Sequence, residues 1–404
     1  MMEVSQENQE QLAATFRDTR AAAERGDAVA QTSLGLMYMD GEGVPKDDAQ
    51  AVVWLRKAAE QGFAGAQYNL GVMYANGRGV AQDTGQAIGW CLRAAERGLA
   101  QAQFNLGAIY EEGRDAAQDD AQAIAWYRKA AEQGHADAQY ALGVIYRNGQ
   151  GVAQDDTQAI AWYRKAADQG DADAQYDLGM MYLLGRGVTQ DDVQAVAWFR
   201  KAAEHGNASA QFNLGVMYEG GQGVTRDDAQ AVAWFRKAAD QGNAAAQNNL
   251  GVMYRKGQGV AQDDSQAIAW YRKAADQGDA DAQYDLGMMY SVGRGVTQDD
   301  AQAASWWRKA AEHGNASAQR NLGLMYLNGI GVARDDAQAF AWFREAADQG
   351  DAVGQANLGW MYENGEGVSQ DSMRAVAWYR KAAKQGQPEA QEALSRMEAS
   401  GRDK

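Results

Sequence analysis

Apolar residues recur along this chain with a period of 36 residues. Each period contains a Leu-Gly pair, and a Tyr follows the Leu four residues later. Residues four apart share one face of a helix, and a fixed period of this length is typical of repeat proteins. We therefore expect ten copies of one helical unit, marked by Leu34, Leu70, Leu106, Leu142, Leu178, Leu214, Leu250, Leu286, Leu322 and Leu358.

The first unit predicts a helix in its first half. Residues 27–40 place Leu34 and Tyr38 on one apolar face. Gly35 lies beside that face, where a mid-helix Gly costs about 1 kcal/mol relative to Ala. Its repetition in every unit indicates that a neighbouring helix approaches closely. The Gly-x-Gly-Val segment at 41–44 should end the helix, since Gly tolerates the left-handed backbone of a C-cap.

A second helix is predicted to begin at Asp47. Its carboxylate can accept hydrogen bonds from the free amides of the first turn, and Gln50 stands at the capping-box position. Ala51, Trp54 and Ala58 then form an apolar stripe, in which the indole fills the space that the alanines leave. Each unit is thus a pair of antiparallel helices. The Trp recurs every 36 residues from Trp54 to Trp378, and we interpret this Trp ladder as core.

A single helix pair cannot bury both of its apolar faces, so neighbouring pairs must stack. The terminal segments should differ from the units between them. We expect an N-terminal capping helix in 1–26, ten repeats in 27–386, and a C-terminal capping helix and tail in 387–404. Residues 171–206 and 279–314 match at 30 of 36 positions, which indicates a duplicated block of repeats.

The repeat resembles the Sel-1-like repeat, a relative of the tetratricopeptide repeat. The pattern A-x-x-x-L-G-x-M-Y-x-x-G-x-G-V-x-x-D-x-x-x-A-x-x-W-Y-R-K-A-A-x-x-G carries the resemblance, and residues 138–170 match it almost throughout, with Ile145 in place of the Met. The resemblance implies an all-α fold, a right-handed α/α superhelical solenoid whose first helices line a concave side. It also implies adaptor or scaffold work in protein complexes. The loop at 113–116 departs from the pattern, because it lacks the second Gly and the Val.

The charge composition limits the classes of partner that the chain is expected to bind. The chain has 38 Lys and Arg against 54 Asp and Glu, a formal net charge of −16. This charge disfavours nucleic acid and anionic lipid, so a basic or neutral protein or peptide is expected. The sequence contains no apolar stretch long enough for a membrane span. We expect a cytoplasmic protein, or a periplasmic or secreted one if a signal peptide has been removed. The oligomeric state is not predicted.

No residue pattern predicts catalysis, a cofactor or a metal ion. The Gly-x-Gly loops lack the third Gly and the preceding strand of a dinucleotide site. Adjacent acids such as Asp119 and Asp120 stand at helix starts, where negative charge is favourable. His135, His205 and His313 have no metal-ligand spacing, and Cys91, the single cysteine, is interpreted as an inert thiol. We expect no enzyme.

The position before each Leu is the candidate binding site. Asn is a poor residue for a helix interior, yet it recurs there. Its amides could form a ladder that bonds a peptide backbone along the concave wall, or they could bond the adjacent repeat. Trp360 could be partly exposed beside them. The candidate partner-binding residues are Asn69, Asn105, Asp177, Asn213, Asn249, Asp285, Asn321, Asn357 and Trp360.

The leading hypothesis is a non-enzymatic scaffold or adaptor that holds a protein or peptide in its concave groove. The side chains near the ladder vary from repeat to repeat, which suits partner specificity. A structural spacer or self-assembling array is an alternative. An envelope-associated hydrolase is a further one, although neither an S-x-x-K motif nor a candidate triad is present.

Overall fold

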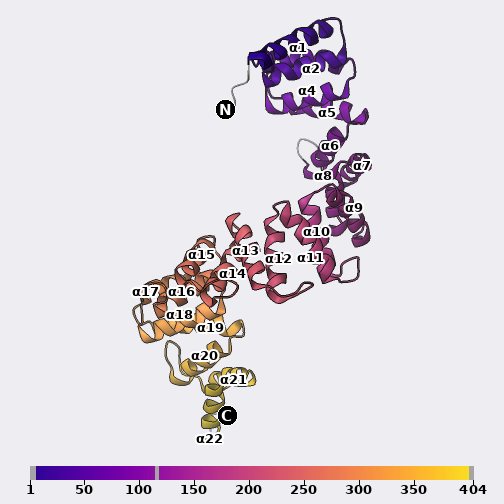
Figure 1. Ribbon diagram of the computed structural model, residues 1–404. Coiled ribbons are helices and arrows are strands. Elements are labelled where there is room, and N and C mark those ends of the chain that lie inside the picture. Colours follow the sequence, from indigo (N-terminus) through magenta and orange to yellow (C-terminus); the bar gives the residue numbers. More distant parts are fainter. Residues whose placement is uncertain (1–5, 114–117, 400–404) are drawn as a thin grey trace. The chain divides into compact units, whose positions relative to one another are not determined.

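The computed structural model describes residues 6–113 and 118–399, and this part of the chain is all helical (Figure 1). It begins with α1 (Gln6–Glu24) and ends with α22 (Pro388–Ala399), and helix pairs alternate between them. The first helices of the pairs are α2 (Ala28–Asp40), α4 (Ala64–Asn76), α6 (Ala100–Glu112), α8 (Ala136–Asn148), α10 (Ala172–Leu184), α12 (Ala208–Gly220), α14 (Ala244–Lys256), α16 (Ala280–Val292), α18 (Ala316–Asn328) and α20 (Ala352–Asn364). The second helices are α3 (Asp48–Glu60), α5 (Thr84–Glu96), α7 (Asp120–Glu132), α9 (Asp156–Asp168), α11 (Asp192–Glu204), α13 (Asp228–Asp240), α15 (Asp264–Asp276), α17 (Asp300–Glu312), α19 (Asp336–Asp348) and α21 (Ser372–Lys384).

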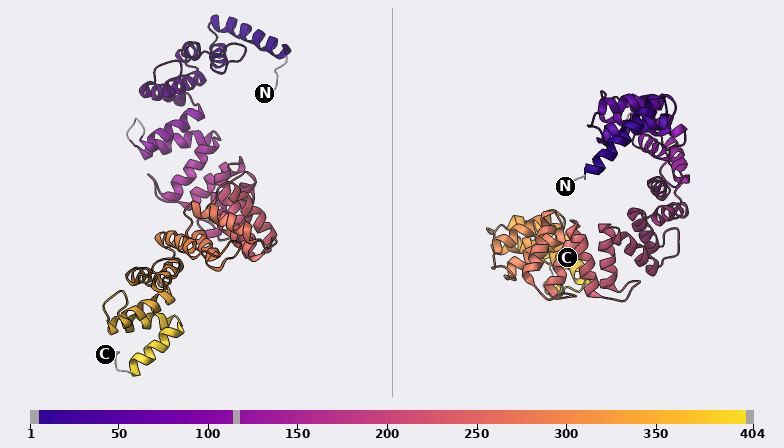
Figure 2. Two further views of the ribbon diagram at one scale, coloured as in Figure 1. Left: turned by 90° about the vertical axis from the view of Figure 1, so that its left-hand side faces the viewer. Right: turned by 45° about the horizontal axis from the view of Figure 1, so that its top comes forward.

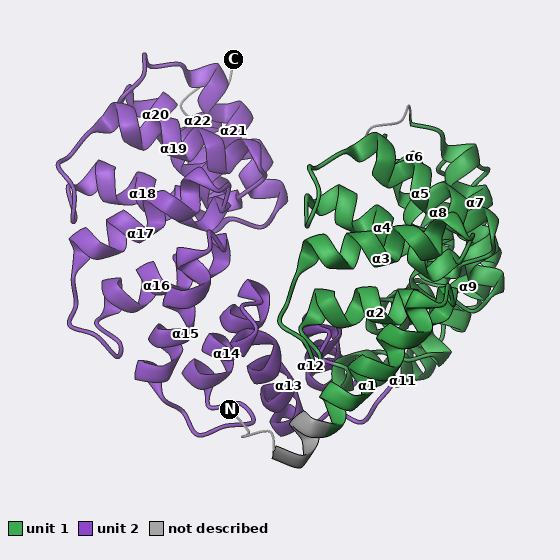
Figure 3. Ribbon diagram, turned by 90° about the horizontal axis from the view of Figure 1, so that it is seen from above, with its two compact units in different colours: residues 1–205 green, residues 206–404 purple. Residues whose placement is uncertain are grey.

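The chain divides into two compact units, residues 1–205 and 206–404 (Figure 3). Within each unit, every helix packs against the helix before it and the helix after it (Figure 2). This arrangement confirms the predicted solenoid of stacked helix pairs. Among the described residues, no helix is both long enough and apolar enough to cross a bilayer.

The helix ends follow the predicted capping chemistry. The Asp47 carboxylate accepts a hydrogen bond of 3.0 Å from the backbone N–H of Gln50, so Asp47 is the N-cap rather than the first helical residue. At the end of α2, Gly41 has φ 81°, and its N–H donates to the Met37 carbonyl at 2.9 Å. The atypical loop of the third repeat lies largely at 114–117, outside the described residues.

The mid-helix glycines seat side chains of the second helices, as their repetition predicted. A Cβ built on Gly215 would lie 2.6 Å from Cδ1 of Phe235, so only Gly fits beneath the ring. Each repeat thus pairs a mid-helix Gly of the first helix with the residue that follows the Trp on the second helix. We call this pair of positions the ring seat. Eight repeats place a ring there: Tyr127, Tyr163, Phe199, Phe235, Tyr271, Trp307, Phe343 and Tyr379. In the first repeat Leu55 fills the seat.

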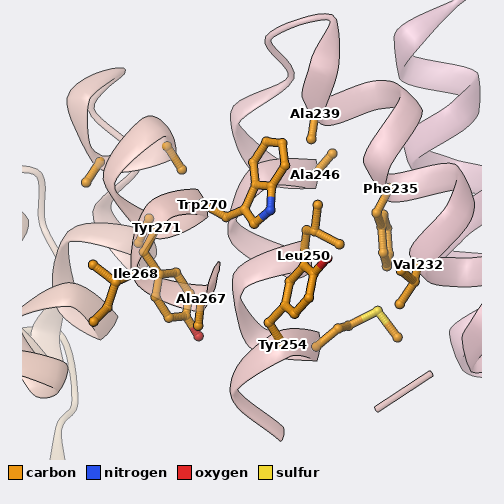
Figure 4. Close-up of a cluster of buried hydrophobic side chains, with 14 of the residues drawn as sticks. Val232, Phe235, Ala239, Ala246, Leu250, Tyr254, Ala267, Ile268, Trp270 and Tyr271 are labelled. Atoms are coloured by element: carbon orange, nitrogen blue, oxygen red, sulfur yellow. The ribbon is translucent and has the colours of Figure 1, made fainter. Parts of the chain in front are cut away.

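The core of each repeat forms between three helices. In the close-up of Figure 4, Leu250 and Tyr254 of α14 lie between Phe235 of α13 and Tyr271 of α15. All four side chains are at most 9% exposed. Consecutive repeats therefore share buried side chains in this cluster, to which α13, α14, α15 and α16 contribute.

Buried glutamines link the helix pairs. Gln67 of α4 donates from Nε2 to the Ala59 carbonyl of α3 at 3.0 Å. The side chain of Gln61 donates to Gln31 Oε1 at 2.7 Å. The same Gln–Gln contact recurs in six later repeats, and at two positions histidine replaces the donor glutamine. His205 and His313 bond Gln175 and Gln283, so these histidines serve the scaffold. The exception is Gln67, which faces Arg97 at the equivalent position and whose Oε1 has no hydrogen-bond partner among the described residues.

The Trp ladder packs against the core with one face and against a cation with the other. Trp90, Trp126, Trp198 and Trp270 are buried, and the other six ladder indoles are half-buried. In nine repeats a Lys or Arg three residues later stands 3.7–4.4 Å from the ring centroid. The ladder is thus core only in part, because the chain's own cations cover its outer face.

Candidate functional site: the first-helix face

The first helices share a face made of three positions: the residue before the Leu, the second residue after it, and the fifth. In α8 these are Ala141, Val144 and Arg147. We call the surface made by these positions the first-helix face. The middle position is apolar in every repeat and is nowhere fully buried, as at Leu36, Val72, Ala108, Val144, Met180, Val216, Val252, Met288, Leu324 and Trp360.

The two aspartates of the predicted ladder are paired with the preceding repeat. Asp177 accepts a hydrogen bond of 2.8 Å from Arg147, and its side chain is only 9% exposed. Burial raises the pKa of the Asp177 carboxyl although the guanidinium opposes this change. Asp285 lies 3.8 Å from Arg255 in the same relation. Asp stands before the Leu in these two repeats alone, and each follows an Arg thirty residues earlier.

The asparagines show several environments. Asn105 donates from Nδ2 to the Tyr68 hydroxyl of the preceding first helix at 3.2 Å. Asn321 directs Nδ2 toward the Met288 sulfur at 3.9 Å. The Nδ2 atom of Asn357 is buried with no hydrogen-bond partner among the described residues. The remaining ladder side chains are half-buried on α4, α12 and α14: Asn69, Asn213 and Asn249.

These contacts show one role of the ladder. Asn105, Asp177 and Asp285 bridge consecutive repeats, which was the alternative interpretation of the pattern. A role of the ladder in holding a ligand stays a prediction. Trp360 lies on α20 with 39% of its surface exposed, on the same face.

The charged residues at the fifth position form a second network that the sequence reasoning missed. Tyr127 donates to Glu111 at 2.6 Å, and Tyr379 donates to Glu363 at 2.8 Å. Burial raises the pKa of both of these tyrosine hydroxyls. In these two repeats the hydroxyl of the seated Tyr therefore satisfies the carboxylate of the fifth residue.

The signal for this network is present in the sequence. A charged fifth residue is accompanied by Tyr sixteen positions later in four repeats, at Glu111, Arg147, Arg255 and Glu363. Glu219 is the exception, because Phe235 fills its seat and offers no hydroxyl. The variation near the ladder was interpreted as suited to partner specificity, but in these four repeats the fifth residue contacts the ring beneath it.

The chemistry of the face comes from its apolar side chains, its amides and a few charged groups. Among the described residues, no group of three or more His, Cys, Asp and Glu is placed to hold a metal ion. The face combines half-exposed apolar side chains with amides and a few charges that are largely neutralised by the scaffold. Such a surface can contact a polypeptide without further chemistry.

Comparison with known proteins agrees with this architecture. The chain is 42% identical to a protective antigen of uropathogenic Escherichia coli strains with an SLR fold, with a TM-score of 0.89 over 96% of this chain and 83% of the other. It is 39% identical to a Sel1 repeat protein from Oxalobacter formigenes, with a TM-score of 0.63 over 77% and 90% of the two chains. No curated protein matches the chain.

The family assignment rests on every repeat. The Sel1 repeat matches ten consecutive segments of 36 residues: 28–63, 64–99, 100–135, 136–171, 172–207, 208–243, 244–279, 280–315, 316–351 and 352–387. Proteins with this kind of repeat generally mediate contacts between proteins. The chain belongs to the Sel1 repeat family.

Proposed function

We propose that this chain is a non-enzymatic scaffold whose first-helix face holds another protein or a peptide. One observation carries the proposal. The middle position of the face stays apolar through all ten repeats, and none of these side chains is fully buried. The most exposed are Val216, with 38% of its surface accessible, and Trp360, with 39%.

Burial of this apolar row would supply the affinity. Apolar surface removed from water contributes about 25 cal/mol per Å², and a preformed helical surface needs little ordering on binding. Half-exposed ladder amides such as Asn249 could bond the backbone of the partner. The net charge of −16 favours a basic or neutral partner over an acidic one.

The experiment places a photo-crosslinking residue at one exposed valine of the full chain. Val216 lies on the first-helix face, and Val193 on α11 is an exposed valine of a second helix, with 63% of its surface accessible. We expect identified partner proteins to cross-link from position 216 and not from 193. Equal cross-linking from both positions would contradict the proposal, since the control position is the more exposed one.

The ladder is tested separately within the same assay. Asn213→Ala with Asn249→Ala removes two amides from neighbouring first helices and leaves the apolar row in place. Reduced recovery of the cross-linked partner is the expected result. Unchanged recovery would remove the ladder from the proposal. Cross-links only to a second copy of the chain would favour a self-assembling array instead.

A further inference from the structure

The ring seat of the second repeat holds no ring. Gly71 keeps the seat glycine on α4, but Cys91 stands on α5 where eight other repeats have Tyr, Phe or Trp. A Cβ built on Gly71 would lie 3.0 Å from the Ala87 carbonyl oxygen and 3.5 Å from the Cys91 amide nitrogen and the Trp90 Cβ, so its three nearest neighbours include no ring atom. The second repeat therefore keeps the seat glycine although no aromatic residue follows the Trp of α5.

The vacant seat is a pocket of about 300 Å³ between α4, α5 and α6. Cys91 and Ile88 of α5 line it, together with Val72 of α4 and Ile109 of α6. Ala75 widens the opening, because other repeats have Leu, Met, Ser, Glu or Arg at this fifth position. The pocket thus opens on the first-helix face and is mostly apolar.

We propose that this pocket receives an aromatic side chain of the bound polypeptide. The inference rests on the proposed function and names the side chain that the face would recognise. Its occupant is argued from the sister repeats, in which the equivalent volume is filled by an aromatic ring. An apolar cavity of roughly 150 Å³ already suffices for benzene, so a benzyl or phenol group fits here.

Tyr68 gives the pocket an aromatic wall. In four sister repeats the aromatic residue at the same position contacts the seated ring, with centroids 5.6–5.8 Å apart. Offset and tilted ring pairs at this distance are favourable beyond their buried area. Asn105, a ladder residue, also lines the pocket.

Cys91 serves here as a small side chain that lines the pocket, and not as a nucleophile. Its side chain is 7% exposed, and the sulfur lies 3.5 Å from the Ala102 carbonyl oxygen. Burial raises the pKa of the thiol to about 11, so the thiolate is scarce at neutral pH. Because it is the single cysteine of the chain, it reports on the pocket.

The test uses the full chain with N-acetyl-phenylalaninamide, N-acetyl-leucinamide and N-acetyl-alaninamide as probes. Binding is measured by saturation-transfer NMR, and occupancy by the rate at which methyl methanethiosulfonate modifies Cys91. We expect the phenylalanine amide to bind at least about tenfold more tightly than the alanine amide and to slow the modification. The leucine amide should bind more weakly than the phenylalanine amide.

Two variants make the result specific. Cys91→Phe supplies the ring from within the chain, as at Phe199, and should abolish binding of the phenylalanine amide. Cys91→Ala keeps the pocket open and should retain it. Failure of the phenylalanine amide to bind the natural chain, or equal binding to Cys91→Phe, would overturn the inference, as would equal binding of the leucine amide. Cross-linking from Val216 does not use this pocket, so the two proposals fail separately.

Discussion

The Arg147–Asp177 pair provides a quantitative prediction for the variant Asp177→Asn. The substitution keeps the shape of the side chain and removes its charge, so Arg147 is left as a half-buried cation without a counter-ion. Loss of one partner from a fully buried pair costs about 3–5 kcal/mol. The Arg147 side chain keeps 28% exposure, so we expect about 1–2 kcal/mol after allowing for solvent screening.

The double variant Arg147→Leu/Asp177→Asn should recover this loss. It reproduces the combination that the chain already has at Leu327 and Asn357. Desolvation outweighs the attraction of Arg147 at the Asp177 carboxyl and raises its pKa. Replacement of such a pair by apolar and neutral groups is often neutral or stabilising. We therefore expect the double variant to be more stable than Asp177→Asn, in which the Arg147 charge stays unpaired.

The assay is hydrogen exchange of the full chain, read by mass spectrometry, because a long repeat array need not unfold in one step. Amides of α8 and α10 should exchange about 5- to 30-fold faster in Asp177→Asn. Helices α14 and α16, which carry the equivalent pair Arg255 and Asp285, serve as the internal control. Unchanged exchange in α8 and α10, or a double variant less stable than the single one, would refute the reasoning.

The same pair has a pH dependence in the single variant Arg147→Leu. Without the guanidinium, the buried Asp177 carboxyl should have a pKa raised further above its ordinary value of 3.8. A carboxyl with a raised folded-state pKa contributes stability at low pH that is lost as pH rises through that pKa. The variant should therefore lose more stability at pH 7 than near pH 4, whereas the natural chain should show a smaller difference. A pH-independent loss would contradict this account.

Two further changes test the scaffold. Glu345→Lys should restore the cation over Trp342 that the nine other repeats possess and stabilise the chain by about 0.5–1 kcal/mol in urea unfolding; no gain would show that this stacking is energetically neutral. Gly215→Ala should cost about 1–3 kcal/mol, because its Cβ meets the Phe235 ring at 2.6 Å. Gly220→Ala in the same helix meets nothing within 4 Å and should be neutral or stabilising; equal losses in both variants would contradict the ring seat.

The local structure could be predicted because the residues that cap and pack each helix recur at the same positions in successive units. The capping role of Asp47, the left-handed Gly41 and the close approach at Gly35 all depend on residues near in sequence. Each signal was present ten times or nearly so, and random patterning does not produce such agreement. The helix boundaries differ from the prediction by one residue where a cap was counted as helix, as at Asp27.

The contacts between helices were harder to predict. Tyr127 pairs with Glu111 sixteen residues away, and Asp177 pairs with Arg147 thirty residues away. Arg147 and Asp177 lie in different units, and the Glu111–Tyr127 pair, although it lies within one unit, becomes evident only from the residues that change together between units. The vacant ring seat at Cys91 was equally hard to predict. Only comparison with the other repeats shows that an aromatic ring is missing there.

The central claim is that the first-helix face receives the partner, and hydroxyl-radical footprinting of the full chain tests it directly. Met288 and Trp360 lie on the face and are readily oxidised, and Met373 on α21 is a second-helix control with 71% exposure. With a partner identified by cross-linking, we predict that oxidation of Met288 and Trp360 falls while that of Met373 is unchanged. Protection of Met373 with continued oxidation of Met288 and Trp360 would contradict the account.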